Sequence, residues 1–592
     1  MAKQQDRQRT TVRNTVFESD DSVCLSDIEE EFQRTCASGI ESSEDSDNVV
    51  TFRPSRRINR ICDTSESNNE MDQNSDWQNV TENDTYSGYI AFSTGDKVQG
   101  PQVPTDCITP LQFFSLFFTD ELISKITTET NLYAQQIISG REVSTHSLWQ
   151  NWYEVTAVEM KAFLGVIINM GLMPVHDIKD YWSKKFNAYI PFYNNIFRRQ
   201  RFLQIFWALH LETTPQTGNR ERISVNKVAH LLNYLDQKFR QHFVPAQNIA
   251  VDESTVGFKG RVSFKTYNPK KPNKWGLRLY VLADSLTGYV YTFLPYFGKQ
   301  TTNALIDPDL PITSRIVLHL YNNLQQSIPG AQGYHIYTDR LYTSIILGER
   351  LLKLQCHLTG TIMTNRKGIP LSMKSPKLRI GETVAYRKEE TLLLAWRDKR
   401  VVSMLSTGGT SRYQIVGNRR AGNNTAQPVF KPSIIAEYNK NMGGVDLADQ
   451  YTSTYCFLRK TLKWWRKLFF WGLEVSIINA YVLYKACPNT TKKLSHKQFR
   501  EKLVLDLVKN IRVTAKRGEP SSSDKEQRLN GKLHIITLHP QNKHKDCAVC
   551  SNRKVPGGRK ETSYICETCD RKPGLHVGQC FKRYHTMVNY KL

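Results

Sequence analysis

Two aspartates stand at the ends of segments that are typical of buried strands. Asp252 lies in AVDE and Asp339 in IYTD, and the neighbouring residues are mostly apolar or aromatic. A carboxylate at the end of a buried strand is costly unless it is paired or binds a metal ion. If the two strands are neighbours, the carboxylates converge and offer the oxygen ligands that Mg²⁺ prefers. Such a site could act on a phosphodiester, although each aspartate could equally be only a helix cap or a loop acid.

A third acid is needed to complete this site, and spacing alone leaves the choice open. Asp446 and Asp449 lie three residues apart in GGVDLADQ, which puts them on one face of a helix. Gly443 and Gly444 stand just before that helix and allow a close approach of the backbone. Glu437 is the alternative that spacing does not exclude.

The C-terminal tail carries a second set of possible metal ligands. Two CxxC pairs are followed by further Cys and His, giving seven candidates: Cys547, Cys550, Cys566, Cys569, His576, Cys580 and His585. Each thiolate pair can grip one edge of a tetrahedral Zn²⁺ site, and zinc can supply the folding energy of a short segment. Two full sites need eight ligands, and His534, His539 and His544 are the candidates for the eighth.

The charge of the chain favours a polyanionic partner. Of 592 residues, 80 are Lys or Arg and 56 are Asp or Glu, so the formal net charge is +24. That sign suits nucleic acid, or equally a generally basic surface. The sequence has neither a secretory signal nor an apolar run of the roughly 18–20 residues that span a bilayer. We therefore expect an intracellular protein with no membrane partner, located in the nucleus if it binds DNA.

Composition and periodicity divide the chain into segments of different class. The first part is acidic and lacks apolar periodicity, which predicts disorder. Helical spacing follows, and then the order strand, strand, strand, helix, strand, helix, strand, which predicts a mixed α/β domain. A basic, β-rich insertion interrupts that domain before helices resume. The expected boundaries are 1–104, 105–250, 251–363, 364–430, 431–455, 456–530, a linker at 531–546 and the Cys-rich segment 547–592.

Two basic groups are candidates for DNA contact. The insertion contains Arg366 and Lys367, and a later run mixes cations with Trp464 and Trp465. Such mixtures suit phosphate contact and base stacking. The later run consists of Arg459, Lys460, Lys463, Arg466 and Lys467. A solvated face, or an amphipathic helix with its tryptophans in the core, explains the same residues equally well.

The sequence resembles the piggyBac family of transposases from about residue 108 to the C-terminus. The resemblance rests on five strings in one order: FFSLFFTDELISKITTETN, NIAVDESTVGFKGR, YTDRLYTSI, EYNKNMGGVDLADQ and a Cys/His tail that ends in CFKRYH. It implies an RNase H-like catalytic core with Asp252, Asp339 and Asp446 as the catalytic triad. Asp449 is implied as an additional ligand for two Mg²⁺ or Mn²⁺ ions.

The resemblance also implies a function for the other segments. Segments 105–250 and 456–530 would form one helical domain for dimerisation and DNA binding. Segments 251–363 and 431–455 would form the catalytic domain around the insertion 364–430, and 547–592 would form a cross-brace domain with two zinc ions. His576 departs from the family pattern because close relatives have Cys there. The implied homodimer would bind terminal inverted repeats, nick them, form and open hairpin ends, and integrate at TTAA.

Two other functions fit parts of the same pattern. A domesticated relative would be a nuclear DNA-binding protein that no longer transposes, although the intact aspartates argue against it. The cross-brace tail is also typical of RING-like ubiquitin ligases, but its neighbours are basic and no hydrophobic groove for a conjugating enzyme is evident.

Overall fold

The computed structural model describes residues 76–80, 84, 88–139, 147–212, 220–269, 274–420, 426–457, 461, 463–490, 493–514, 528–531, 533–541, 543–553, 555–569 and 571–591. The chain divides into two compact units, 1–511 and 512–592. Each unit is described by itself.

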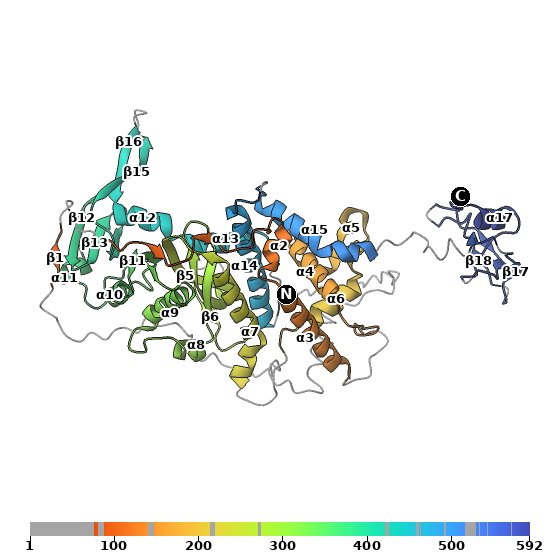
Figure 1. Cartoon of the computed structure of the whole chain (residues 1–592), viewed down its shortest axis with the longest axis horizontal. Coiled ribbons are helices and arrows are strands. Elements are labelled where there is room, and N and C mark those ends of the chain that lie inside the picture. Colours follow the sequence, from red (N-terminus) through yellow and green to blue (C-terminus); the bar gives the residue numbers. More distant parts are fainter. Residues whose placement is uncertain are drawn as a thin grey trace, which may run out of the picture. The chain divides into compact units, whose positions relative to one another are not determined.

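The larger unit is built on a ten-stranded mixed sheet (Figure 1). Its order is β1-β12-β13-β14-β11-β10-β5-β7-β6, and β8 also pairs with β7. The catalytic candidates belong to the part formed by β5 (Asn248–Gly257), β7 (Trp275–Asp284), β8 (Val290–Pro295), β10 (Tyr334–Thr338) and β11 (Cys356–Thr361). The helices α9 (Ile312–Ser327) and α10 (Ile345–Lys353) connect these strands. The predicted order of three strands, helix, strand, helix, strand is therefore confirmed.

The direction of the strands decides which residues can meet. β7 runs antiparallel to β5, whereas β10 is parallel to both β5 and β11. Nearly every residue of β7 is buried, which explains its continuous apolar sequence. Because β5 and β10 are parallel neighbours, the residues that follow them lie at the same end of the sheet.

The insertion does not form a separate sheet. β12 (Thr383–Lys388), β13 (Thr391–Arg397) and β14 (Val401–Ser406) continue the catalytic sheet, because β14 pairs with β11. Their buried side chains form a cluster with Ile434 and Ile435 of the helix α12 (Ser433–Asn441). The expected boundary at residue 364 therefore does not coincide with a boundary in the sheet. Periodicity could not reveal this, because it gives the type of a strand and not its neighbour.

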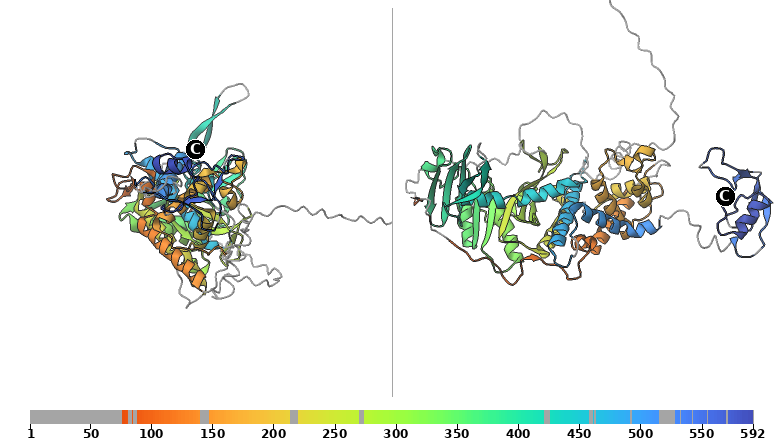
Figure 2. Two further views of the ribbon diagram at one scale, coloured as in Figure 1. Left: turned by 90° about the vertical axis from the view of Figure 1, so that its right-hand side faces the viewer. Right: turned by 90° about the horizontal axis from the view of Figure 1, so that it is seen from above.

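A separate two-stranded ribbon projects from this end of the unit. β15 (Tyr413–Arg420) and β16 (Ala426–Pro432) pair only with each other among the described strands. The ribbon stands clear of the body of the unit in two views (Figures 1 and 2).

A helical region adjoins the sheet, as predicted from the periodicity. It contains α3 (Asp120–Ser139), α4 (Ala157–Leu172), α6 (Arg199–Ala208), α7 (Arg220–Gln241), α14 (Trp464–Ala486) and α15 (His496–Thr514). Thr156 and Glu159 form a capping box that starts α4. Nearly all residues of α14 are buried, which is the expected position for a helix that is apolar on all sides. The helix α14 packs against α7 and the short helix α2 (Pro110–Ser115).

The prediction of disorder throughout 1–104 is wrong for its last part. β1 (Gln78–Asn79) pairs with β12, β2 (Ser93–Thr94) with β9 (Ala331–Gln332), and β3 (Gly100–Pro101) with β4 (Phe243–Val244). These contacts use backbone hydrogen bonds over two residues at a time, so they leave no apolar period in the sequence. Residues 1–75 lie outside the described part.

The smaller unit contains short strands and one helix. β17 (Ile536–Leu538) pairs with β20 (Tyr564–Cys566), β18 (Lys545–Asp546) pairs with β19 (Glu561–Thr562), and α17 (Gln579–Thr586) follows. Arg528 is buried and donates to the carbonyl oxygens of Tyr584 and Met587, both at 2.7 Å. The expected linker 531–546 is therefore wrong, because these residues belong to the folded unit. Among the described residues, no helix is both long and apolar enough to cross a membrane.

Candidate active site and metal centre

The parallel pairing of β5 and β10 brings the first two aspartates to the same level. Val251 is opposite Thr338 in the register, so Asp252 and Asp339 are each the next residue on adjacent strands. Both side chains are partly buried. The convergence expected from the strand ends is therefore confirmed, although Asp252 lies within a long strand and not at its end.

The helix α13 (Gly444–Thr454) brings two more acids to this region. Asp446 is in its first turn, and Asp449 follows one turn later. The hydroxyl of Ser254, two residues after Asp252 on β5, donates to Oδ1 of Asp449 at 2.6 Å. This contact ties α13 directly to the catalytic strand.

Gly444 allows this close approach. A Cβ atom at residue 444 would lie 2.9 Å from the carbonyl oxygen of Asp284, the last residue of β7, a distance that real Cβ atoms essentially never show. Gly443 has no atom within 4 Å of its corresponding position. The prediction that glycine allows close backbone approach is confirmed for Gly444 and is wrong for Gly443.

The acids influence one another electrostatically. Burial, with added repulsion from Glu253 and Asp339, raises the pKa of Asp252 to about 8. Burial together with the charges of Asp339, Asp252 and Asp446 raises the pKa of Tyr438, on α12, to about 12. The charges of all three aspartates of the predicted triad therefore raise the pKa of the same tyrosine.

Glu437, the other candidate for the third acid, faces elsewhere. It lines a cavity with His335 and Tyr337 of β10 and His357 of β11, and none of the four aspartates lines that cavity. The tertiary structure thus distinguishes Asp446 from Glu437 as the third acid, which spacing alone could not do.

Three contacts around the acids were not foreseen from the sequence. The backbone N–H of Leu341 donates to Oδ1 of Asp339 at 2.5 Å, and the hydroxyl of Tyr342 donates to Oε2 of Glu253 at 2.7 Å. The guanidinium of Arg366 donates to the carbonyl oxygen of Leu341 at 2.6 Å. They fix the loop after Asp339 against β5. The partly buried Arg366 thus braces the loop that carries Asp339, a position that its basic character alone did not indicate.

The basic run before α14 does not form a DNA-contacting surface as a whole. Arg466 is 1% exposed, donates to the carbonyl oxygen of Trp207 at 3.0 Å and lies over the rings of Phe206 and Trp465. Lys467 is 7% exposed, and burial lowers its pKa. The predicted DNA contacts of these two residues are therefore wrong. A helix with its tryptophans in the core is the correct interpretation there.

The other basic candidates differ in position. Lys463 is partly buried and donates to the hydroxyl of Tyr133 at 3.4 Å, and Lys367 is exposed. Arg459 and Lys460 lie outside the described residues.

In the smaller unit, eight ligand side chains form two clusters. The first contains Cys547, Cys550, His576 and Cys580, and the second contains His534, Cys566, Cys569 and His585. Within each cluster the potential ligand atoms all lie within 4.8 Å of one another. The clusters interleave along the chain, which is the cross-brace arrangement. His534 fills the eighth position, while His539 and His544 are in neither cluster.

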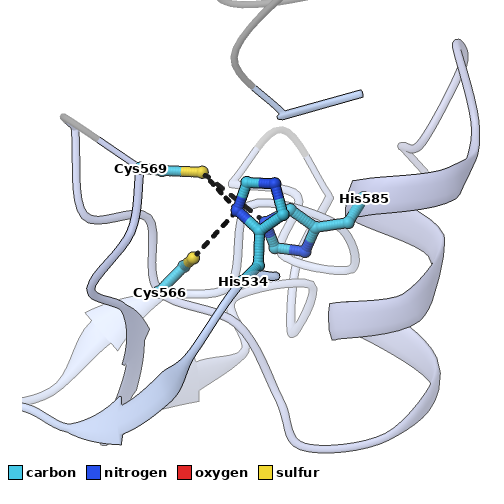
Figure 3. Close-up of side chains that lie close together, drawn as sticks. All are labelled: His534, Cys566, Cys569 and His585. Atoms are coloured by element: carbon cyan, nitrogen blue, oxygen red, sulfur yellow. Dashed lines mark hydrogen bonds between the residues drawn. The ribbon is translucent and has the colours of Figure 1, made fainter. Parts of the chain in front are cut away.

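The sulfur–nitrogen distances suit a shared ion in each cluster. Cys566 and Cys569 lie 3.8 and 3.6 Å from Nδ1 of His534, and Cys569 lies 3.5 Å from Nε2 of His585 (Figure 3). In the first cluster Cys550 lies 3.3 Å from Nδ1 of His576. Tetrahedral zinc with its usual bond lengths separates such ligands by about 3.3–3.8 Å.

The outward-facing nitrogens of two histidines are held by backbone oxygens. Nε2 of His576 lies 3.1 Å from the carbonyl oxygen of Glu561, and Nδ1 of His585 lies 2.9 Å from that of Phe581. Each contact leaves the other ring nitrogen as the lone-pair ligand, as in known metal sites. Burial would raise the pKa of Cys547, but hydrogen bonds from the backbone around Cys550, Val549 and His576 lower it to about 6. The thiolate is thus favoured at Cys547, whereas burial and the neighbouring thiols raise the pKa of Cys550 and Cys580.

Comparison with known proteins identifies the family. A family model described as Transposase IS4 matches residues 109–481, and a model described as a DDE_Tnp_1-like zinc finger matches residues 530–586. Human PiggyBac transposable element-derived protein 3 is 28% identical over 81% of this chain and 76% of its own length. The chain belongs to the piggyBac-derived transposase family. The resemblance predicted from the motifs is therefore confirmed.

Two further comparisons agree with that assignment. Human PiggyBac transposable element-derived protein 2 is 26% identical over 81% of the chain and 76% of its own length. A solved structure of piggyBac transposase in a synaptic complex with hairpin DNA has the same fold, with a TM-score of 0.62 and 22% identity. That match covers 84% of this chain and 100% of the other. The zinc-finger match begins at residue 530, which agrees with the corrected start of the smaller unit.

Proposed function

We propose that this transposase cuts and rejoins DNA with two divalent metal ions held by Asp252, Asp339, Asp446 and Asp449. The observation that carries the proposal is the convergence of acids from β5, the end of β10 and α13. Carboxylates that are gathered in this way repel one another, and burial together with that repulsion raises the pKa of Asp252. A bound cation would remove it.

The donor set fits Mg²⁺ or Mn²⁺. All the donors are carboxylate oxygens, which are the ligands that these hard cations prefer. Bound ions would lower the pKa of a water nucleophile and stabilise the leaving oxygen at phosphorus. The contribution of the chain is positioning: Ser254 orients Asp449, the backbone of Leu341 orients Asp339, and Tyr342 holds Glu253 beside Asp252.

The proposed reaction is cut-and-paste transposition. The enzyme nicks the transposon ends, forms and resolves hairpin ends, and integrates at TTAA. The strand arrangement β8-β7-β5-β10-β11, in which β7 runs opposite to the others, supports an RNase H-like core. The similar solved structure holds hairpin DNA, which supports the hairpin step.

The smaller unit would bind two Zn²⁺ ions and recognise the terminal inverted repeats. Its ligands would be the two interleaved clusters, and its basic surface would contact phosphates. Arg553 and Arg559 are exposed but both bind Asp546, so part of that surface is internally compensated. The helical segments 105–250 and 456–530 would provide dimerisation and further DNA contact in the nucleus.

Excision of a reporter in cells tests the proposal. The reporter is interrupted by a segment flanked by the element's own terminal repeats, and Asp252→Asn, Asp339→Asn and Asp446→Asn are compared with the wild type. Asp398→Asn, in the exposed turn between β13 and β14, is the matched control. We expect wild type and control to restore the reporter with a clean TTAA, and the three site variants to fail. Equal excision by a site variant would refute the metal-site assignment.

A second function is favoured by the names of the relatives. The human relatives are transposable element-derived proteins, so this chain could be a nuclear DNA-binding protein that has lost transposition. The same experiment separates the two functions. A wild type that binds the repeats as purified protein but never excises the reporter would establish the binding function instead.

A further inference from the structure

The ribbon β15–β16 is held by side-chain contacts at its base, and the described part of the chain does not cover it beyond the base. At the base, the hydroxyl of Tyr413 donates to the carbonyl oxygen of Gly381 at 3.2 Å, and Lys431 lies 5.7 Å from the ring centroid of Trp396. Arg412 donates to the carbonyl oxygen of Asp84 at 3.1 Å. Beyond the base, the ribbon extends away from the sheet (Figures 1 and 2). These contacts hold the base of the ribbon, and the exposed side chains beyond it are not covered by the described part of the chain.

Apolar side chains lie on the uncovered part. Ile415 and Phe430 are direct partners across the ribbon, and they are 61% and 55% exposed. The neighbouring Val416 is 42% exposed. Isolated two-stranded ribbons are only marginally stable in water, and a cross-strand apolar pair adds only about 0.2–1 kcal/mol to their stability. These exposed apolar side chains are suited to contact a partner molecule.

The charge of this segment indicates the class of partner. Between residues 399 and 436 there are six basic residues and no Asp or Glu. They are Lys399, Arg400, Arg412, Arg419, Arg420 and Lys431. Arg419 and Arg420 stand at the far end of β15. A segment of one sign complements a polyanion.

The strand edges argue against a protein strand as the partner. β16 contains Pro428 and Pro432, which have no N–H to donate to an added strand. Repulsion between basic ribbons also opposes the pairing of two copies. The major groove of DNA, in contrast, is wide enough for a two-stranded ribbon, and the methyl groups of thymine offer apolar contacts there.

The ribbon is also connected to the catalytic site. β16 ends at Pro432, and α12 begins at the next residue. The same helix packs against β5, the strand that carries Asp252. The arm therefore starts from a helix that adjoins the strand of the proposed catalytic site.

We propose that β15–β16 is an arm that enters the major groove of the duplex on which the catalytic site acts. Ile415 and Phe430 contact thymine methyl groups, and Arg419 and Arg420 supply charge to the phosphates. The inference rests on the proposed function, because it takes duplex DNA as the substrate.

Duplex binding by the full chain tests the arm. Fluorescence anisotropy measures the Kd of an arbitrary thymine-containing duplex and of the same duplex with deoxyuridine in place of thymine, without divalent metal so that no strand is cut. Each methyl group lost from a buried contact weakens wild-type binding by about fourfold. The double variant Ile415→Ser/Phe430→Ser should bind the thymine duplex more weakly and no longer distinguish the two duplexes.

The charge of the arm is tested separately by salt dependence. The double variant Arg419→Ser/Arg420→Ser should reduce the slope of log K against log salt by about 1.8, because each phosphate contact contributes about 0.9. Ile380→Ser is the matched control for loss of an exposed apolar side chain, since Ile380 is 81% exposed in the same insertion but outside the ribbon. This control should behave as the wild type does.

Three results would contradict the proposal that the ribbon is a DNA-binding arm. One is unchanged affinity and salt slope in both double variants. Another is equal discrimination against deoxyuridine in wild type and Ile415→Ser/Phe430→Ser, which would refute the groove contact. The third is a change in oligomeric state with no change in DNA binding, which would make the ribbon a contact between copies. If the arm contacts DNA while the excision test fails, only the transposition proposal is lost.

Discussion

The two units of this protein differ in how metal-ligand side chains relate to the fold. In the larger unit the sheet and the helices pack around one extensive apolar core. This core already stabilises the fold beside which the acids lie. In the smaller unit the buried cluster has only six residues, and half of them are the ligand cysteines Cys547, Cys566 and Cys569. Removing metal should therefore leave the first fold intact with uncompensated charge, and should deprive the second of most of its stability.

The largest effect is expected from a zinc ligand. Cys566→Ser removes a fully buried member of the second cluster, and structural zinc contributes on the order of 10 kcal/mol to the folding of such modules. We expect residues 528–591 to lose protection in hydrogen exchange while the larger unit keeps its melting temperature. Cys456→Ser, outside the module, is the control. A protected module in the variant, or in chelator, would show that the module folds without zinc.

The proposed catalytic acids should give the opposite result when metal is absent. The folded-state pKa of Asp252 is about 8, above its ordinary value of 3.8, so the native state holds a proton that the unfolded state has lost between these values. Metal-free stability should therefore fall as the pH rises from about 4 to about 8. Asp252→Asn should flatten that dependence and raise the melting temperature at pH 8.

Thermal unfolding across this pH range, with and without Mg²⁺, measures the effect. Mg²⁺ should restore the stability of the wild type at pH 8, whereas Asp398→Asn should follow the wild type throughout. If Asp252→Asn is less stable than the wild type in metal-free buffer at pH 8, the acids do not repel one another as the structure indicates.

The buried Arg466 of the larger unit should contribute to folding stability and not to DNA binding. Arg466→Ala removes a side chain packed on aromatic rings and leaves the carbonyl oxygen of Trp207 without this donor, which should cost about 3 kcal/mol of unfolding free energy. Denaturant unfolding and duplex affinity per folded molecule are the two measurements. Lys367→Ala, at an exposed position, should leave stability unchanged. A loss of affinity without loss of stability in Arg466→Ala would restore its DNA-binding role.

The smallest effect is expected from the hydrogen bond between Tyr342 and Glu253. Tyr342→Phe keeps the buried ring and removes only the hydroxyl, a change of about 1–2 kcal/mol. We expect strand cleavage to slow by about tenfold and to need more Mg²⁺ for half-maximal rate. Tyr296→Phe is the matched control, because Tyr342 and Tyr296 both contact the ring of Tyr280 edge-on. Cleavage with an unchanged metal requirement would exclude a positioning role.

The sequence by itself determined the types of the main elements and most of the ligand candidates. Helical spacing predicted the helical region, and the order of strands and helices predicted the mixed sheet, because periodicity is a local property. The CxxC spacing likewise identified both thiolate pairs, since a metal imposes that spacing on neighbouring residues.

Only the tertiary structure decided which of these residues meet. It separated Asp446 from Glu437, selected His534 over His539 and His544, and divided the ligands into two interleaved clusters. It also joined the insertion to the catalytic sheet and buried Arg466 and Lys467. The physical reason is that charge and spacing are properties of the linear sequence. The convergence of distant side chains depends instead on strand order, on register and on the close approach of α13 that Gly444 permits.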